Sequence, residues 1–336
     1  MSFKNIANTI IIDAYRKLYK GNVFLDLLLD SRKEFVEYRI LQESHIEEQF
    51  NFMRRNLLYV LNNKVEEFDE TGLETILNYL NDFTVDLRLD LNRVINKDIK
   101  GIIETGSNPY KEMFEYLTEK YKLKRVSNSQ FNKAIDKKNG EVVAYISNKQ
   151  YGTRSKNTMK LSGRIWKSSL YAKTGIIKVL RNGLNKGLSV NEMAKQLNKY
   201  MTPSARNTIL KKEIGKKFPS NPHYYAKRVA RTEAQHSYQK SMYESGQVMP
   251  SYEGIIWVLS NRHPKYDICD KIANETKYGE KGFYPKGKEP IVPHPQCICT
   301  QIQKLENNDD FIDRLIAWDE GKKDKKLDNW YKNYIK

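Results

Sequence analysis

The chain has 336 residues, of which 39% are hydrophobic and 29% are charged, and its formal net charge is +17. This length predicts two or three folding units with enough apolar residues for a core. Three cysteines exclude a disulfide scaffold, and no run of 18 apolar residues could span a membrane. The first residues lack a signal-peptide pattern, so we expect a chain made and kept in a reducing cytosol.

The positive charge is concentrated in one part of the chain. Residues 151–250 contain 20 basic and 4 acidic side chains, a net charge of +16, whereas residues 1–120 have a net charge of −5. A concentrated basic segment attracts a polyanion, and such binding weakens steeply with salt. Two interpretations stay open: contact with nucleic acid, or lysine-rich helices that only keep a solvated face.

Residues 1–120 are predicted to form long helices. Apolar residues recur there at steps of three and four positions, and proline is absent before Pro109. Gly72 and Gly101 are the expected breaks between helices. The mixed charges are typical of solvated helix faces, so we expect these helices to pack on one another or on a partner.

Residues 121–160 differ from the helical region that precedes them. Residues 137–140 have the composition of a turn, and residues 141–146 resemble a short strand. We therefore expect a hairpin or an ordered linker here.

Helices are predicted again over residues 163–246. Gly187 is placed to cap the C-terminus of the first of them. Ser189 and Glu192 have the spacing of a capping box for the second helix. Pro222 is placed in the first turn of the third.

Residues 250–303 are expected to form a small module of a different kind. Residues 255–259 are apolar and predict a buried strand, and a loop rich in glycine and proline follows. Residues 306–336 are predicted to be a short helical tail. The expected fold class is therefore α+β and mostly helical, with long N-terminal helices, a central basic helical region and a small β-containing Cys/His module.

The three cysteines have the most distinctive chemistry in the chain. Cys297 and Cys299 are two positions apart, so on an extended strand both side chains point to the same face. Cys269 lies upstream across a loop that could fold back. Three thiols with His294 or His263 would complete a tetrahedral zinc site, although one intervening residue is fewer than common zinc signatures have.

Two other interpretations of the cysteines stay open. In one, all three are small buried hydrophobic residues in a compact module. In the other, one cysteine is a nucleophile with His236, His263 or His294 as its base, for which the sequence shows no activating context. The motifs of zinc deaminases, phosphate-binding loops, nucleophile elbows and zinc metalloproteases are absent from the sequence.

Four groups of residues recur in the order of a known family. They are LSGRIW at 161–166 followed by NKGLS at 185–189, RVARTEA at 228–234, Trp257 followed by His263-Pro264 and DICD at 267–270, and PHPQCICT at 293–300. Together they resemble the minor head proteins of tailed phages, the Mu F-like head morphogenesis family, over about residues 155–303. The structural motif residues that this resemblance implies are Trp166, Arg231, Glu233 and Trp257.

The resemblance implies a non-enzymatic component of the virion. Such a protein associates with the portal protein or the major capsid protein, contacts packaged double-stranded DNA and needs no membrane. It would lie in the head interior or at the portal vertex after assembly in the host cytoplasm. The resemblance covers residues 161–305, and the expected division of the chain is 1–120, 121–160, 161–305 and 306–336.

The chain also departs from the family. Many members have Cys-x-x-Cys where this chain has Asp267-Ile268-Cys269. Asp267 or His263 would then replace the missing thiolate as a metal ligand. Some relatives append a toxin or ADP-ribosyltransferase domain after the Cys/His module, and the short tail of this chain is too small for one.

These features predict roles for separate regions. Residues 1–120 would dock on a portal or capsid partner, and the central region would contact DNA through Lys211, Lys212, Lys216 and Lys217. The alternative function is a zinc- or cysteine-dependent nuclease or transferase that acts on nucleic acid. A third is a plain nucleic-acid-binding protein of the host.

The pair Arg231 and Glu233 allows two interpretations. Two positions apart on a helix, the side chains face different directions. Either Arg231 contacts phosphate, or Glu233 pairs with a basic side chain of a neighbouring helix, which we favour.

Overall fold

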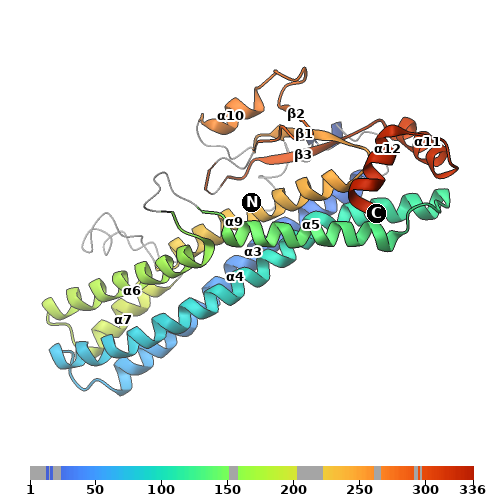
Figure 1. Cartoon of the computed structure of the whole chain (residues 1–336). Helices are drawn as coiled ribbons and strands as arrows, with labels where there is room; N and C mark the ends of the chain where they lie inside the picture. The colour runs from blue at the N-terminus through green and yellow to red at the C-terminus, as the bar shows by residue number, and fades with distance from the viewer. Residues whose placement is uncertain are drawn as a thin grey trace. The chain divides into compact units, whose positions relative to one another are not determined.

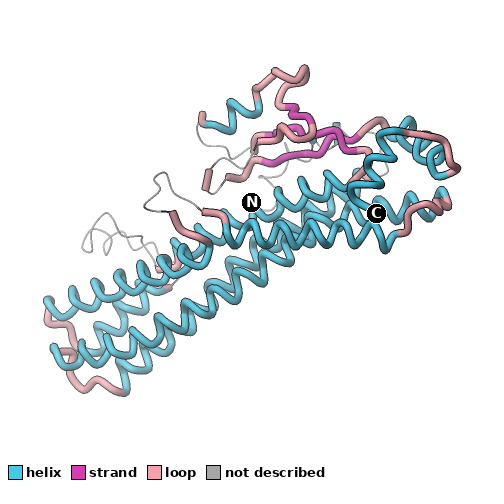
Figure 2. The backbone as a smooth tube through the Cα atoms, viewed as in Figure 1, coloured by secondary structure: helices cyan, strands magenta, loops and turns pink. Residues whose placement is uncertain are grey.

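A computed structural model describes residues 13–14, 16–17, 24–150, 158–202, 222–260, 266–290, 294–295 and 297–336. Helices dominate, and one small antiparallel sheet lies in the C-terminal part of the chain (Figures 1 and 2). The expected α+β, mostly helical fold class is thereby confirmed. In this described part, no helix combines the length and the apolarity that crossing a bilayer requires.

The elements follow one another along the chain with short connections. The helices are α3 (Leu25–Asn63), α4 (Glu70–Tyr121), α5 (Asn128–Asn148), α6 (Leu161–Asn185), α7 (Val190–Met201), α9 (Tyr224–Val248), α10 (Ile268–Ala273), α11 (Asn308–Asp319) and α12 (Lys325–Trp330). A π-helical turn, η2 (Tyr331–Ile335), ends the chain. The strands are β1 (Tyr252–Val258), β2 (Phe283–Pro285) and β3 (Thr300–Leu305).

The chain divides into two compact units, each assembled from segments that are distant in the sequence. The helical unit consists of Arg39–Asp98 and Ser147–Arg231. The sheet unit consists of Met1–Tyr38, Ile99–Ile146 and Thr232–Lys336. The helices α3, α4 and α9 each contribute residues to both units.

In the helical unit, the predicted helix signals are present. The side chain of Ser189 accepts from the backbone N–H of Glu192, and the Glu192 carboxylate accepts from the backbone N–H of Ser189 at 2.8 Å, which is the expected capping box at the start of α7. Gly187 follows α6 with φ of +61°, a left-handed conformation that favours glycine.

Neither of the glycines expected to break the N-terminal helices does so. The break between α3 and α4 lies before Glu70, and the carboxylate of Asp69 caps α4 by accepting from the backbone N–H of Gly72 at 2.8 Å. Gly101 lies inside α4, where an added Cβ would stand 2.5 Å from the hydroxyl oxygen of Tyr38. The prediction of a break at Gly101 is wrong because this glycine provides room for an aromatic ring.

The expected hairpin over residues 121–160 is also wrong. Helix α5 occupies most of this range, and its buried residues Phe131, Ile135, Val142 and Ile146 follow helical spacing. The ring of Phe131 stacks on Phe114 with centroids 4.1 Å apart. Burial of this helical stripe outweighs the turn composition of residues 137–140.

The sheet unit is built around β1, which is the central strand. The strand order is β2-β1-β3, both pairings are antiparallel, and Trp257 of β1 pairs with Gln301 of β3. This strand confirms the one predicted from residues 255–259. Gly254, at an irregularity in the register, would place a Cβ 2.1 Å from the backbone oxygen of Tyr284.

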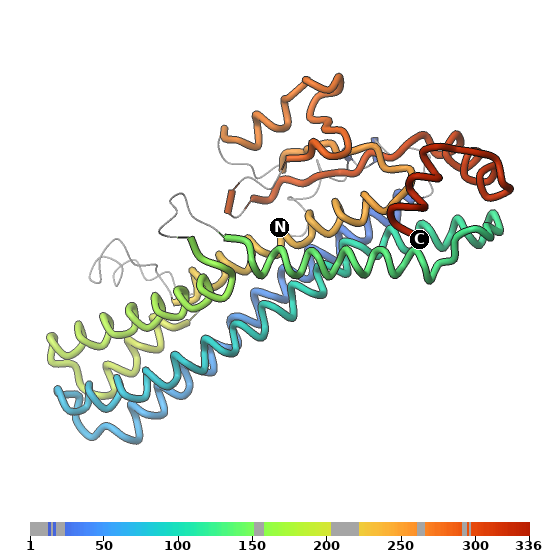
Figure 3. Tube along the Cα trace, in the orientation of Figure 1, coloured from blue at the N-terminus to red at the C-terminus, as the bar shows by residue number. Residues whose placement is uncertain are grey.

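Distant segments meet in the core of the sheet unit. The early part of α3, the late part of α4 and the late part of α9 run side by side (Figure 3), and Phe35, Ile102 and Tyr238 join them in one buried cluster. The rings of Phe35 and Tyr238 stack with centroids 4.1 Å apart. The helical tail packs on the same unit, where Trp330 Nε1 donates to the backbone oxygen of Val248 at 2.6 Å.

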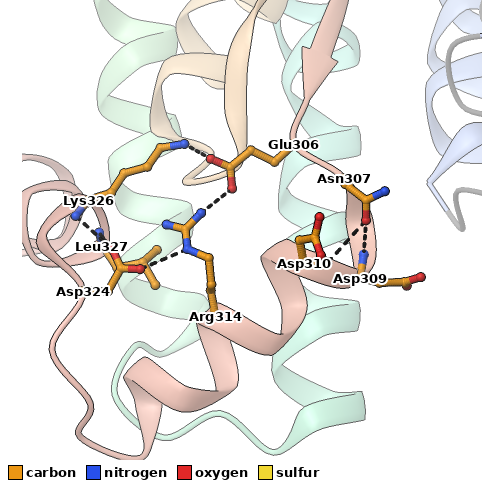
Figure 4. Close-up of polar contacts among 8 residues, drawn as sticks. All are labelled: Glu306, Asn307, Asp309, Asp310, Arg314, Asp324, Lys326 and Leu327. Atoms are coloured by element: carbon orange, nitrogen blue, oxygen red, sulfur yellow. Dashed lines mark hydrogen bonds and ion pairs between the residues drawn. The ribbon is translucent and has the colours of Figure 1, made fainter.

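A network of charges joins β3 to the tail. Arg314 on α11 donates to Glu306, just after β3, at 2.7 Å and to Asp324, the N-cap of α12, at 3.0 Å (Figure 4). Lys326 also pairs with Glu306. Asn307 caps α11 by accepting from the backbone N–H groups of Asp309 and Asp310 (Figure 4). These contacts fix the predicted tail helices relative to the end of the sheet.

Candidate metal centre

The three cysteines come together in the sheet unit. Cys269 lies in the first turn of α10, and Cys297 and Cys299 lie on the extended segment that leads into β3. All three thiols are buried, none forms a disulfide, and their sulfur atoms lie within 4.8 Å of one another. The prediction that Cys297 and Cys299 face one point, with Cys269 folded back onto them, is confirmed.

His294 adds an imidazole to the cluster. Its Nε2 lies 3.4 Å from the sulfur of Cys269, and its Nδ1 lies 3.0 Å from the backbone oxygen of Pro295. Because a carbonyl oxygen only accepts, Nδ1 must donate that hydrogen bond. The bond leaves the lone pair of Nε2 facing the thiols, which is the arrangement found in metal-bound histidines.

Asp267 lies on the opposite side of Cys269 from the other thiols' backbone. Its Oδ1 accepts from the backbone N–H of Cys269 at 2.6 Å, as part of the capping box that starts α10. Its Oδ2 lies 3.2 Å from Nε2 of His294. A carboxylate and an imidazole lone pair repel each other at this distance, so the contact requires either a second proton on the ring or a cation among these groups.

The distances in the cluster fit a tetrahedral ion. Zinc–sulfur bonds of about 2.3 Å and zinc–nitrogen bonds of about 2.0 Å place two tetrahedral ligands about 3.5–3.8 Å apart. The sulfur atoms of Cys269 and Cys297 are 3.5 Å apart, and the Cys269 sulfur is 3.4 Å from the imidazole of His294. The cluster of three thiols and one imidazole could therefore hold a metal ion such as zinc.

The local environment keeps the thiols protonated in the absence of a cation. Hydrogen bonds with the thiols of Cys297 and Cys299, together with burial, raise the pKa of Cys269 far above its ordinary range. A bound zinc ion reverses this effect, because a coordinating thiol is deprotonated outright.

Helix α9 supports the cysteine segment from below the sheet (Figure 1). The side-chain amides of Gln235 and Gln239 both donate to the backbone oxygen of Cys299, at 2.9 and 2.6 Å. All three residues are buried. Sequence reasoning missed these two glutamines, because nothing in their spacing distinguishes a buried amide from a solvated one.

Trp257 lies in the same unit and is buried on β1. Its backbone N–H donates to the oxygen of Gly282 at 2.9 Å, and the N–H of Gly282 donates to Glu275, just after α10, at 2.7 Å. The strand that carries Trp257 is thus linked to the segment that carries Cys269.

The other predicted site residues lie elsewhere. Trp166 belongs to α6 of the helical unit and is 46% exposed. Arg231 makes a bidentate contact with Glu43 on α3, with both N–O distances at 2.6 Å. Glu233 is completely buried, with its carboxylate 3.8 Å from Nδ1 of His236 on the same helix.

Five predicted residues fall outside the described part of the chain. They are the candidate ligand His263 and the candidate DNA contacts Lys211, Lys212, Lys216 and Lys217.

Comparisons with models of protein families, with curated proteins and with solved structures found no match to this chain. Membership of the phage head family therefore stays a prediction that depends on the four groups of residues quoted above.

Proposed function

We propose that the Cys/His cluster holds one structural zinc ion and that the protein is a non-enzymatic minor head protein of a tailed phage. One observation carries the proposal: the two segments of the resemblance that contain cysteine contribute to a single cluster. Cys269 comes from the segment after β1, and His294, Cys297 and Cys299 come from the segment before β3. A zinc ion would fasten these two segments to each other.

The ligand set supports a structural role for the ion. Cys269, Cys297, Cys299 and His294 provide four protein ligands, and a zinc ion held by four such ligands has no open position for water or substrate. Sulfur-rich sites also favour zinc over magnesium or calcium. Among the described residues, both groups of potential metal ligands include Cys269, so they form one site and not the paired sites of a two-metal nuclease.

The surface of the helical unit supports docking on a portal or capsid partner. Phe52 and Tyr59 on α3 are 50% and 60% exposed, and Leu89 on α4 is 55% exposed. Large apolar side chains in solvent mark surfaces that bind other proteins when they gather in a patch. The net charge of +16 over residues 151–250 supports contact with packaged DNA.

Mass spectrometry of purified, DNA-filled heads tests the proposed location. We expect the chain in mature heads and in complexes isolated with the portal protein. Its absence from such particles would contradict the proposal.

Assays on the isolated protein test the enzymatic alternative. Nucleic-acid substrates are incubated with the wild type and with Cys297→Ser, and the proposal predicts no turnover by either protein. Turnover by the wild type that Cys297→Ser abolishes would identify an enzyme and overturn the structural role.

A further inference from the structure

A basic stripe runs along helix α6 of the helical unit. This helix contains five basic residues and no acidic one. Four of the five recur with two polar residues at steps of three and four positions, which places all six within roughly 100° of the helix circumference. This α6 stripe consists of Arg164, Lys167, Tyr171, Thr174, Lys178 and Arg181.

The opposite face of α6 is buried in the protein. Ile165, Ala172, Ile176 and Val179 have exposed fractions of 1% or less. The burial of this apolar face fixes the rotation of the helix about its axis. Lys167 and Arg181 consequently lie exposed in solvent.

Close packing holds the helix rigidly. An added Cβ at Gly175 would lie 2.1 Å from the hydroxyl oxygen of Tyr200 on α7, so the two helices approach as closely as glycine permits. Tyr171 stacks on Tyr225 of α9 with centroids 4.5 Å apart. Lys167 Nζ lies 5.8 Å from the centroid of Tyr171. The stripe therefore presents its charges on a preformed support.

Other cations of the helical unit are already neutralised. Lys227 and Arg231 on α9 pair with Glu47 and Glu43 on α3. By contrast, the sequence of α6 supplies no carboxylate within one turn of any stripe residue inside the helix. The stripe is thus a surface on which an external anion can supply the missing negative charge.

We infer that the α6 stripe binds the sugar–phosphate backbone of duplex DNA without sequence preference. The inference deepens the DNA contact of the proposed function and rests on it. From Arg164 to Arg181 the helix rises about 25 Å, and duplex DNA carries a negative charge for roughly every 1.7 Å of its axis. The stripe faces a polyanion with cations near both of its ends.

The geometry favours DNA over a membrane surface. A helix that binds a bilayer inserts its apolar face into the headgroup boundary. The apolar face of α6 packs inside the protein. Only the polar stripe and the exposed indole of Trp166, next to Lys167, are available to a partner.

The test compares salt dependence of binding to a duplex of random sequence. The stripe variant replaces Arg164, Lys167, Lys178 and Arg181 with glutamine in the full chain. Each phosphate contact contributes about 0.9 to the slope of log K against log salt, so losing all four contacts should reduce the slope by about 3.6. We expect binding at least about tenfold weaker than that of the wild type at 0.1 M salt.

A matched control carries the same charge change on a different unit. The control variant replaces Lys133, Lys137, Lys322 and Lys323, all exposed in the sheet unit, with glutamine. We expect it to keep a slope within about one contact of the wild-type slope. Equal losses in both variants would overturn the inference, because they would reflect net charge alone.

Two further outcomes separate this inference from the proposed function. If the wild type binds duplex but only replacement of Lys211, Lys212, Lys216 and Lys217 lowers the slope, the stripe assignment is wrong and the DNA contact stands. If the wild type does not bind duplex, both fail. Competition by polyglutamate as effective as that by DNA of equal charge would instead identify an acidic protein partner.

Fluorescence provides a local readout. Trp166 is exposed, whereas Trp257, Trp318 and Trp330 are buried. Duplex binding at the stripe should quench the indole of Trp166, and Trp166→Phe should remove the quenching. Full quenching in that variant would contradict the assignment.

Discussion

Removal of the metal should weaken the sheet unit selectively at the cysteine segment. A ligand that binds only the folded state stabilises it by RT ln(1 + [L]/Kd), or about 4 kcal/mol at a free concentration a thousand times Kd. We therefore expect a chelator to lower the free energy of opening around β1, β3 and α10 by about 4 kcal/mol in the wild type. Hydrogen exchange followed by mass spectrometry measures this local stability directly.

Cys269→Ala distinguishes a metal ligand from a buried apolar plug. Cys269 is completely buried and contacts both Cys297 and His294. If it is a ligand, the variant should lose most of the metal-linked stability, and a chelator should change it by less than about 1 kcal/mol. A plug predicts a modest loss that is independent of chelator.

Ile302→Val is the matched control in the same unit. Ile302 is completely buried on β3, so the loss of one methyl group should cost about 0.5–1.5 kcal/mol. This variant should keep the full response to chelator. An equal chelator response in Cys269→Ala and Ile302→Val, or none in the wild type, would refute the reasoning.

Three other variants test the packing and the charges of the two units. Glu43→Gln removes the bidentate contact with Arg231 and should lower the free energy of unfolding in urea by about 1–3 kcal/mol. Burial raises the pKa of Glu43 and the hydrogen bond from Arg231 outweighs it, so the pKa lies below its usual 4.5. The contribution of the ion pair is complete above that value and is lost as pH falls through the depressed pKa, so Glu43→Gln should blunt acid sensitivity. Gly101→Ala should cost about 1–3 kcal/mol, because the ring of Tyr38 must move, and an unchanged melting temperature would count against the close contact. Burial, with a smaller effect of a nearby lysine, lowers the pKa of His223 to about 3, so stability should be complete above pH 6.5 and decline between pH 6.5 and 3; an NMR titration of this ring near its ordinary 6.5 would contradict its burial.

Local chemistry made several features predictable from the sequence. The capping box of Ser189 and Glu192 and the left-handed Gly187 depend on neighbouring residues alone. The shared face of Cys297 and Cys299 follows from the alternation of an extended strand. These predictions needed no knowledge of the distant chain, and the structure confirms them.

Other features depend on segments that the sequence does not place. The helix α5 begins with a reciprocal contact between Ser127 and Gln130, a capping signal that was present but was outweighed by the turn composition around Gly140. The role of Gly101 depends on Tyr38, which a different helix supplies. Periodicity shows which residues share a face and does not show which ring will lie against it.

The support of the cluster is the clearest case. Gln235 and Gln239 reach the backbone oxygen of Cys299 across more than fifty residues of chain. Polar residues on a helix are usually solvated, so their burial could be recognised only after the sheet was placed over α9. The cysteines, by contrast, announced a cluster because their chemistry is rare in this chain.

Metal content of the protein purified without chelator tests the central claim most directly. Mass spectrometry of the native protein and of its alkylated form measures bound zinc and thiol reactivity on the same sample. The account predicts one zinc ion per chain, with Cys269, Cys297 and Cys299 protected from alkylation until the zinc is removed. A metal-free chain, or zinc that remains at one ion per chain in Cys297→Ser with the other two thiols reactive, would contradict it.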